Sequence, residues 1–126
     1  MPNHMNEIAD LFSLKGKTAV VTGTSAGIGA RLARTLVVAG AQVVAMARRT
    51  TQLDLPTSSL GELIPMNVDL EQHDQVADAA RASLEALGGR VDILVNNAAF
   101  LAGGVKAEDE SSAQIQQTLA VNLEAP

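Results

Sequence analysis

Hydrophobic and polar positions along the chain follow two patterns in alternation. Four short apolar stretches have the length and composition of strands in a parallel sheet, at residues 18–22, 42–47, 62–67 and 91–95. The third stretch is the weakest, because Pro65 cannot donate a hydrogen bond within a ladder. The pattern predicts four strands.

Two longer stretches between these strands repeat apolar residues at helical spacing. The first predicts a helix that ends at Gly40 and the second a helix that ends at Gly88 and Gly89, since glycine suits the left-handed residue after a helix. The apolar faces they predict are Ile28, Leu32, Leu36 and Ala39 in the first helix and Val76, Ala80, Leu84 and Leu87 in the second.

The order strand, helix, strand, strand, helix, strand predicts an α/β fold with a parallel sheet covered by helices. Residues 48–61 show no helical period, so the second connection is expected to be short and irregular. Gln114, Leu119 and Leu123 indicate another helix near the end of the chain. A length of 126 residues fits one domain, 1–126.

Charge and composition exclude several classes of partner. The chain has 9 basic and 14 acidic residues, a net charge of −5, which argues against a nucleic-acid or membrane partner. It has no cysteine, and His4 and His73 lie far apart, so no metal site is expected. The opening "MPNHMNEIADLFSL" lacks the apolar core of a signal peptide, and no later stretch is long enough to span a membrane, so we expect a cytoplasmic location.

Three glycines lie where the first strand gives way to the first helix. Gly23, Gly27 and Gly29 have the spacing Gly-x-x-x-Gly-x-Gly, which differs from the Gly-x-Gly-x-x-Gly of many dinucleotide-binding folds. A helix that begins there directs free N–H groups and its positive dipole end at the loop, which favours an anion. The alternative is a tight strand-to-helix turn with no ligand.

Two motifs together resemble the classical short-chain dehydrogenase/reductase family. They are "TGTSAGIG", residues 22–29, and "VDILVNNAA", residues 91–99, and the resemblance extends from "LKGKTAVVTG" to "VNLEAP". It implies a Rossmann-type doubly wound parallel sheet of strand order 3-2-1-4, truncated after the fourth strand and the start of the following helix. The chain would then be the N-terminal, NAD(P)-binding part of an enzyme that is a homo-oligomer at full length.

The resemblance also assigns residues to the cofactor. Those in the glycine loop and after the fourth strand are Gly23, Thr24, Ser25, Ala26, Gly27, Ile28, Gly29, Asn97 and Ala98, with Asn96 in a structural hydrogen-bond network. The alternative for Asn96 and Asn97 is a simple turn after a strand.

Asp69 and Leu70 resemble the pair that meets the adenine edge. Asp69 followed by Gln72 also predicts a capping box for the next helix, and the two roles are compatible. Asn67 is the second choice for the adenine contact.

The family's catalytic residues find one counterpart in this chain, Asn122 in "AVNLEAP", which resembles the residue that holds a water in the proton relay. The alternative is an ordinary asparagine within a helix, where its side chain is locally unfavourable. The family's serine and its Tyr-x-x-x-Lys motif lie beyond the matched region, and the chain contains no tyrosine. The acidic cluster Glu108, Asp109 and Glu110 is interpreted as a solvated helix start.

These motifs predict an NAD(P)-dependent oxidoreductase that transfers hydride between the nicotinamide and a small carbonyl or alcohol substrate. This chain would supply the cofactor-binding half and be inactive alone. The alternative is a dinucleotide-binding module with a regulatory or scaffolding role and no chemistry.

Arg48 and Arg49 follow Ala47 at the end of the second strand, where an NAD site usually places a carboxylate. Guanidinium groups there favour NADP, because they can bind its 2′-phosphate. NAD remains the alternative, with the two arginines as a solvated surface turn. Ala26 stands where NADP-binding relatives often carry a second basic residue.

Overall fold

The computed structural model describes residues 4–126. Residues 1–3, which belong to the segment considered above as a possible leader, lie outside the described residues. Within the described part of the chain, no helix combines the length and apolar character needed to cross a membrane.

Four parallel strands form one sheet, as the apolar stretches predict. They are β1 (Thr18–Thr22), β2 (Gln42–Ala47), β3 (Glu62–Asn67) and β4 (Ile93–Val95), in the order β3-β2-β1-β4. This order and the parallel pairing confirm the doubly wound fold. Because β3 is an edge strand of this sheet, it can accept Pro65, which lies opposite Ala45.

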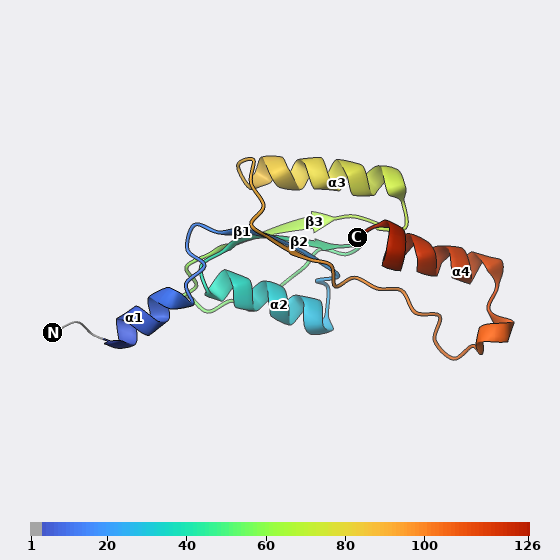
Figure 1. Ribbon diagram of the computed structural model, residues 1–126, viewed down its shortest axis with the longest axis horizontal. Coiled ribbons are helices and arrows are strands. Elements are labelled where there is room, and N and C mark those ends of the chain that lie inside the picture. Colours follow the sequence, from blue (N-terminus) through green and yellow to red (C-terminus); the bar gives the residue numbers. More distant parts are fainter. Residues whose placement is uncertain (1–3) are drawn as a thin grey trace.

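Helices cover both faces of the sheet (Figure 1). The helix α2 (Gly27–Val38) lies against one face and α3 (His73–Ala86) against the other, while α4 (Ser112–Leu119) lies beyond the strands. A 3₁₀ turn, η1 (Ala107–Asp109), precedes α4, and a π-helical turn, η2 (Ala120–Glu124), follows it. The N-terminal helix α1 (His4–Leu11), which the sequence analysis did not predict, projects from the body of the molecule. No helix forms between β2 and β3, as expected from the pattern of residues 48–61.

Alternating residues of the strands supply two separate cores. Ala19 and Val21 of β1 belong to a cluster with Ala33 and Val37 of α2. Val20, between them, belongs to a second cluster on the α3 side of the sheet. The period of two along β1 therefore places a hydrophobic layer under each helix.

The buried faces of both helices differ from those predicted. In α2 the buried residues are Gly29, Ala33 and Val37, whereas Ile28 is 72% exposed. In α3 they are Ala79 and Ser83, whereas Leu84 is 45% exposed. Small residues occupy the contact with the sheet because they allow the helix backbone to approach closely. Of the eight residues predicted to face the core, four are exposed (Ile28, Leu32, Ala80 and Leu84), three are half-buried (Leu36, Ala39 and Val76), and Leu87 is buried as predicted.

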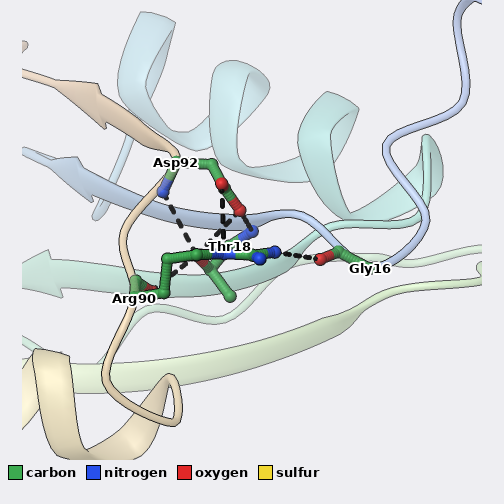
Figure 2. Close-up of polar contacts among 4 residues, drawn as sticks. All are labelled: Gly16, Thr18, Arg90 and Asp92. Atoms are coloured by element: carbon green, nitrogen blue, oxygen red, sulfur yellow. Dashed lines mark hydrogen bonds and ion pairs between the residues drawn. The ribbon is translucent and has the colours of Figure 1, made fainter.

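The chain enters β4 later than predicted, at Ile93 rather than residue 91, because Asp92 turns its side chain toward β1 (Figure 2). The Asp92 carboxylate accepts a hydrogen bond from the Thr18 backbone N–H at 2.9 Å. Arg90 lies 3.2 Å from the same carboxylate and donates to the Gly16 carbonyl at 2.8 Å. This network joins the start of β1 to the start of β4, at the end of the sheet opposite the glycine loop.

The network makes stability depend on pH through Asp92. The Thr18 backbone N–H lowers the pKa of Asp92 below its ordinary value of 3.8, with help from the Thr18 hydroxyl, Arg90 and Lys17 and against the effect of burial. A carboxylate whose pKa is lower in the folded state stabilises the fold above its unfolded pKa, and this contribution is lost as the pH falls through the folded pKa. We expect Asp92→Asn to lower the melting temperature at pH 5 to 7, and the difference from wild type to shrink below pH 3.8.

The measurement is a thermal melt of wild type and variant at a series of pH values. Asp78→Asn is the matched control, because the Asp78 side chain is 74% exposed and pairs with Arg81 on the surface of α3. A constant difference between wild type and Asp92→Asn from pH 3 to 7 would contradict the prediction.

Candidate functional site

The loop between β1 and α2 is shaped by two glycines that take positive φ. Gly23 has a φ of 71° and Gly27 a φ of 62°, a region that side chains other than glycine rarely adopt. Helix α2 begins at Gly27 with Ala26 as its N-cap, and no side chain caps the free N–H groups. The open helix N-terminus therefore has the donors and the dipole that an anion requires.

Gly29 is needed for a different reason. It is buried, and a Cβ placed on it would lie 2.1 Å from the Gly23 carbonyl oxygen and 2.4 Å from the Asn97 Nδ2 atom. The first turn of α2 thus packs directly on the backbone of the loop. Gly29, expected among the cofactor residues, therefore lies beneath the loop, where it holds the loop's shape.

Thr24 is also beneath the surface. It is fully buried, its N–H donates to the Met46 carbonyl at 3.2 Å, and its hydroxyl donates to the same oxygen at 3.1 Å. Direct contact between Thr24 and a cofactor, as expected from the resemblance, is therefore excluded in this conformation. The residue instead fastens the glycine loop to the end of β2.

Asn97 supports the glycine loop from the side of β4. Its Nδ2 donates to the carbonyl oxygens of Thr22 at 3.0 Å and Gly23 at 3.2 Å. The Thr22 hydroxyl in turn accepts the N–H groups of Asn97 at 3.1 Å and Ala98 at 3.0 Å. The structural network therefore belongs to Asn97, and the assignment of Asn96 to it is wrong, because Asn96 is exposed.

A pocket of about 340 Å³ opens where the four strands end. Of the predicted site residues, it is lined by Gly23, Ser25, Arg48, Arg49, Asp69, Leu70, Asn97 and Ala98. Ala26, Gly27 and Ile28 do not line it but are exposed at the start of α2, next to Ser25. Residues that the sequence analysis did not single out complete the wall: Met46, Val68, Glu71, Ala99, Phe100, Gln117 and Val121.

Two arginines lie at the β2 side of this pocket. Arg48 and Arg49 directly follow β2, both are exposed, and both line the pocket. No acidic side chain occupies the end of β2, since Ala47 is its last residue. The local charge at this position is therefore positive.

Asp69 lies across the pocket, after β3. Its Oδ1 accepts the N–H of Glu71 at 3.1 Å, and its own N–H donates to Gln75 Oε1 at 3.0 Å. The predicted capping box is wrong, because α3 begins at His73 with Gln72 as N-cap and no side-chain capping bond. Asn67 does not line the pocket and accepts a hydrogen bond from Thr50 at 3.3 Å, so the structure favours Asp69 for a ligand contact.

The segment after β4 closes one side of the pocket. Gln117 of α4 donates to Glu71 at 2.9 Å, and His73 lies 2.8 Å from Glu124. The first contact joins α4 to the loop that precedes α3, and the second joins η2 to the first residue of α3. Gln117 and Val121 thereby become part of the pocket wall.

Asn122 lies in the π-helical turn η2, but its side chain does not line the pocket. Its Oδ1 accepts the Phe100 N–H at 2.7 Å and its Nδ2 donates to the Phe100 carbonyl at 2.9 Å. The side-chain amide thus fixes the loop after β4 on η2. Each amide atom keeps capacity for one more hydrogen bond, so the role of Asn122 in holding a water stays a prediction.

The acidic cluster does not begin an α-helix, contrary to expectation. Glu108 and Asp109 are exposed in the 3₁₀ turn η1, and Glu110 follows it. Helix α4 instead begins after Ser111, which forms a capping box with Gln114. The sequence feature that marks the start of α4 is therefore Ser-x-x-Gln, not the acidic cluster.

Comparison with known proteins places the chain in a family. Residues 17–126 match the family model for short chain dehydrogenases. The chain belongs to the short-chain dehydrogenase family, which confirms the resemblance seen in the two motifs.

Individual relatives agree with this assignment. The chain is 36% identical over 124 residues to 2-dehydro-3-deoxy-D-gluconate 5-dehydrogenase of Bacillus subtilis (strain 168), covering 94% of this chain and 47% of that protein. A crystal structure of a metagenomic short-chain oxidoreductase in complex with NADP has a TM-score of 0.74 and 37% identity, covering 89% of this chain and 52% of that one. The 3-oxoacyl (acyl-carrier-protein) reductase of Agrobacterium tumefaciens C58 with NADP bound has a TM-score of 0.76 and 28% identity, covering 99% of this chain and 49% of that one. The chain thus spans about half the length of the relatives it matches.

Proposed function

We propose that this chain forms the cofactor-binding half of an NADP-dependent oxidoreductase that acts on a small carbonyl or alcohol. The observation that carries the proposal is the pocket at the carboxyl ends of the strands, with the uncapped N-terminus of α2 beside it. Ligands of open parallel sheets bind at this edge, and a pyrophosphate suits a free helix N-terminus.

The residues of the site fit a dinucleotide in three places. The glycine loop and the start of α2 offer backbone N–H groups to the pyrophosphate, at Ser25, Ala26, Gly27 and Ile28. Arg48 and Arg49 are available to the 2′-phosphate, and Asp69 with Leu70 to the adenine. Gly23, Asn97 and Ala98 form the floor on which the ribose would rest.

A bound nicotinamide cofactor would supply the hydride. What this chain contributes is binding and orientation. Asp69, Glu71, Asn97 and Gln117 are engaged in hydrogen bonds, and Arg48 and Arg49 carry permanent positive charge. Thr22, Thr24, Gly29 and Asn97 hold the glycine loop in shape, and Asn122 holds the loop after β4.

NADP is favoured over NAD on the chemistry of the β2 end. A guanidinium can donate two parallel hydrogen bonds to a phosphate, and no carboxylate is present at Ala47 to repel it. Several structural neighbours are described as complexes with NADP or NADPH, which supports the same choice. A cytoplasmic location, no metal, and self-association of the full-length protein are parts of this proposal that follow from composition and from the family.

A second candidate function is a dinucleotide-binding module without chemistry. It requires only the pocket, the glycine loop and the open N-terminus of α2, all of which this chain contains. Both candidates require the same cofactor pocket, and they differ only in turnover.

The proposed cofactor preference is tested by reversing the charge of one arginine. We expect the wild-type protein to bind NADPH at least about tenfold more tightly than NADH, a difference of about 1.4 kcal/mol. Arg48→Asp is expected to reverse the order, because a carboxylate repels the 2′-phosphate but accepts hydrogen bonds from ribose hydroxyls.

The measurement is a titration of both cofactors into protein expressed from the complete reading frame. Arg81→Asp makes the same change of charge on the exposed face of α3, away from the pocket, and should leave the ratio of the two affinities unchanged. Equal affinities for NADPH and NADH in the wild type would overturn the assignment of NADP.

A further inference from the structure

Thr51 is the one buried residue of the turn that follows β2. Arg48, Arg49 and Thr50 are exposed, whereas Thr51 is 3% exposed. Its hydroxyl oxygen lies 2.5 Å from that of Thr24, which is fully buried under the glycine loop. The contact joins the two segments that would hold the phosphates of a dinucleotide.

The direction of this hydrogen bond follows from the other partner of Thr24. The Thr24 hydroxyl donates to the Met46 carbonyl at 3.1 Å, and a hydroxyl has a single proton to donate. Thr24 must therefore accept from Thr51. The result is an ordered chain of hydrogen bonds from Thr51 through Thr24 to the end of β2.

These hydrogen bonds close a short loop of backbone that contains the two arginines. Met46 lies in β2 just before Arg48 and Arg49, and Thr51 lies just after them, so both ends of the intervening backbone are fixed at the same place. The other side-chain bond of this turn, from Thr50 to Asn67, is exposed and 3.3 Å long. An exposed hydrogen bond contributes less than a buried one whose loss leaves a polar group without its partner. Thr51 is therefore the main anchor of the turn.

We propose that Thr51 is a positioning residue that holds the Arg48–Arg49 turn ready for the 2′-phosphate of NADP. The inference rests on the proposed preference for NADP. A turn that is ordered before binding gives higher affinity than one that must be ordered by the ligand. NADH lacks the 2′-phosphate, so it gains nothing from ordered arginines and depends on Thr51 much less.

The test compares Thr51→Val, which keeps the shape of the side chain and removes the hydroxyl, with Thr51→Ser, which keeps the donor. Affinities for NADPH and NADH are measured by titration in protein from the complete reading frame, with melting temperatures recorded in parallel. We expect Thr51→Val to reduce the preference for NADPH by about five- to tenfold, the size expected for one buried hydrogen bond. Thr51→Ser should restore the wild-type ratio.

Thr35→Val serves as the matched control. Its hydroxyl donates to the Arg31 carbonyl at 2.9 Å on the exposed side of α2, so the same substitution there should leave both affinities unchanged. If the added methyl group prevents Thr51→Val from folding, Thr51→Ala removes the hydroxyl without it, and the same ratio is measured.

The outcomes separate this inference from the proposed function. An unchanged ratio in a wild type that prefers NADPH would overturn the positioning role and leave the assignment of NADP standing. Equal weakening of both cofactors would also overturn it, because the hydroxyl would then serve the glycine loop alone. A wild type without preference would remove the proposed NADP specificity, and the positioning role with it.

Discussion

The 126-residue chain alone is expected to bind NADPH without oxidising it in the presence of any carbonyl substrate. Carbonyl reduction requires a proton donor beside the hydride acceptor, and a positioned general acid contributes about 10²- to 10⁴-fold in rate. The charged residues that line the pocket are Arg48, Arg49, Asp69 and Glu71. Arginine does not release its proton, and both carboxylates act as hydrogen-bond acceptors. We therefore expect a rate at least about 100-fold below that of a protein with the complete catalytic set.

The experiment follows NADPH absorbance with the 126-residue chain and with the product of the complete reading frame, against ketones, ketoacyl thioesters and sugar acids. Binding of NADPH is titrated in the same samples, so that a silent protein is known to be folded and loaded. Substrate-dependent oxidation by the short chain would show that the chemistry lies in the residues described here. A complete protein that binds NADPH but reduces nothing in the panel would favour the non-catalytic module.

Strand positions and their order could be predicted from the sequence because each strand is a short apolar run next to a glycine or polar boundary. The structure confirms β1, β2 and β3 at the predicted bounds. Pro65 weakened the prediction of β3 only because the sequence does not show that this strand lies at an edge. The start of β4 was predicted too early because the Asp92 side chain accepts a hydrogen bond from Thr18, a residue 74 positions earlier in the sequence.

Helix faces could not be predicted in the same way. A prediction based on hydrophobic periodicity places large residues such as Ile28 and Leu84 on the buried face. In the structure, small residues such as Ala33 and Ala79 are buried, because they allow the helix to pack closely on the sheet. The two stripes differ by a single position along the helix. Only the three-dimensional contact between helix and sheet decides which of them is buried.

Site residues that belong to a sequence motif could be predicted. Site residues whose role depends on a contact with a distant part of the sequence could not. The glycine loop and the two arginines are visible in the sequence because their spacing from a strand carries the signal. The pairs Thr24–Thr51 and Glu71–Gln117 join residues 27 and 46 positions apart, so neither is detectable before the topology is known. The supporting network was assigned to Asn96 rather than Asn97 because both follow β4, and the direction in which the chain leaves the strand decides which side chain faces the glycine loop.

Gly29→Ala is expected to damage both the fold and the cofactor site. The new Cβ would lie 2.1 Å from the Gly23 carbonyl oxygen, and this oxygen cannot easily move because it accepts a hydrogen bond from Asn97 at 3.2 Å. Either α2 or the glycine loop must shift. Overpacking of this kind costs about 1–3 kcal/mol in the free energy of unfolding. Because the shift displaces the start of α2 from the loop, we also expect NADPH to bind at least about tenfold more weakly.

Gly103→Ala is the matched control for this substitution. A Cβ on Gly103 would meet no heavy atom within 4 Å, and its φ lies outside the left-handed region, so alanine should be neutral or slightly stabilising there. Denaturant unfolding gives the free energy for each variant, and NADPH titration gives the affinity. If Gly29→Ala matched Gly103→Ala in both measurements, the close packing of α2 on the loop would not be what shapes this site. A loss of affinity in a variant that unfolds like wild type would instead place Gly29 in contact with the cofactor, as the family resemblance first suggested.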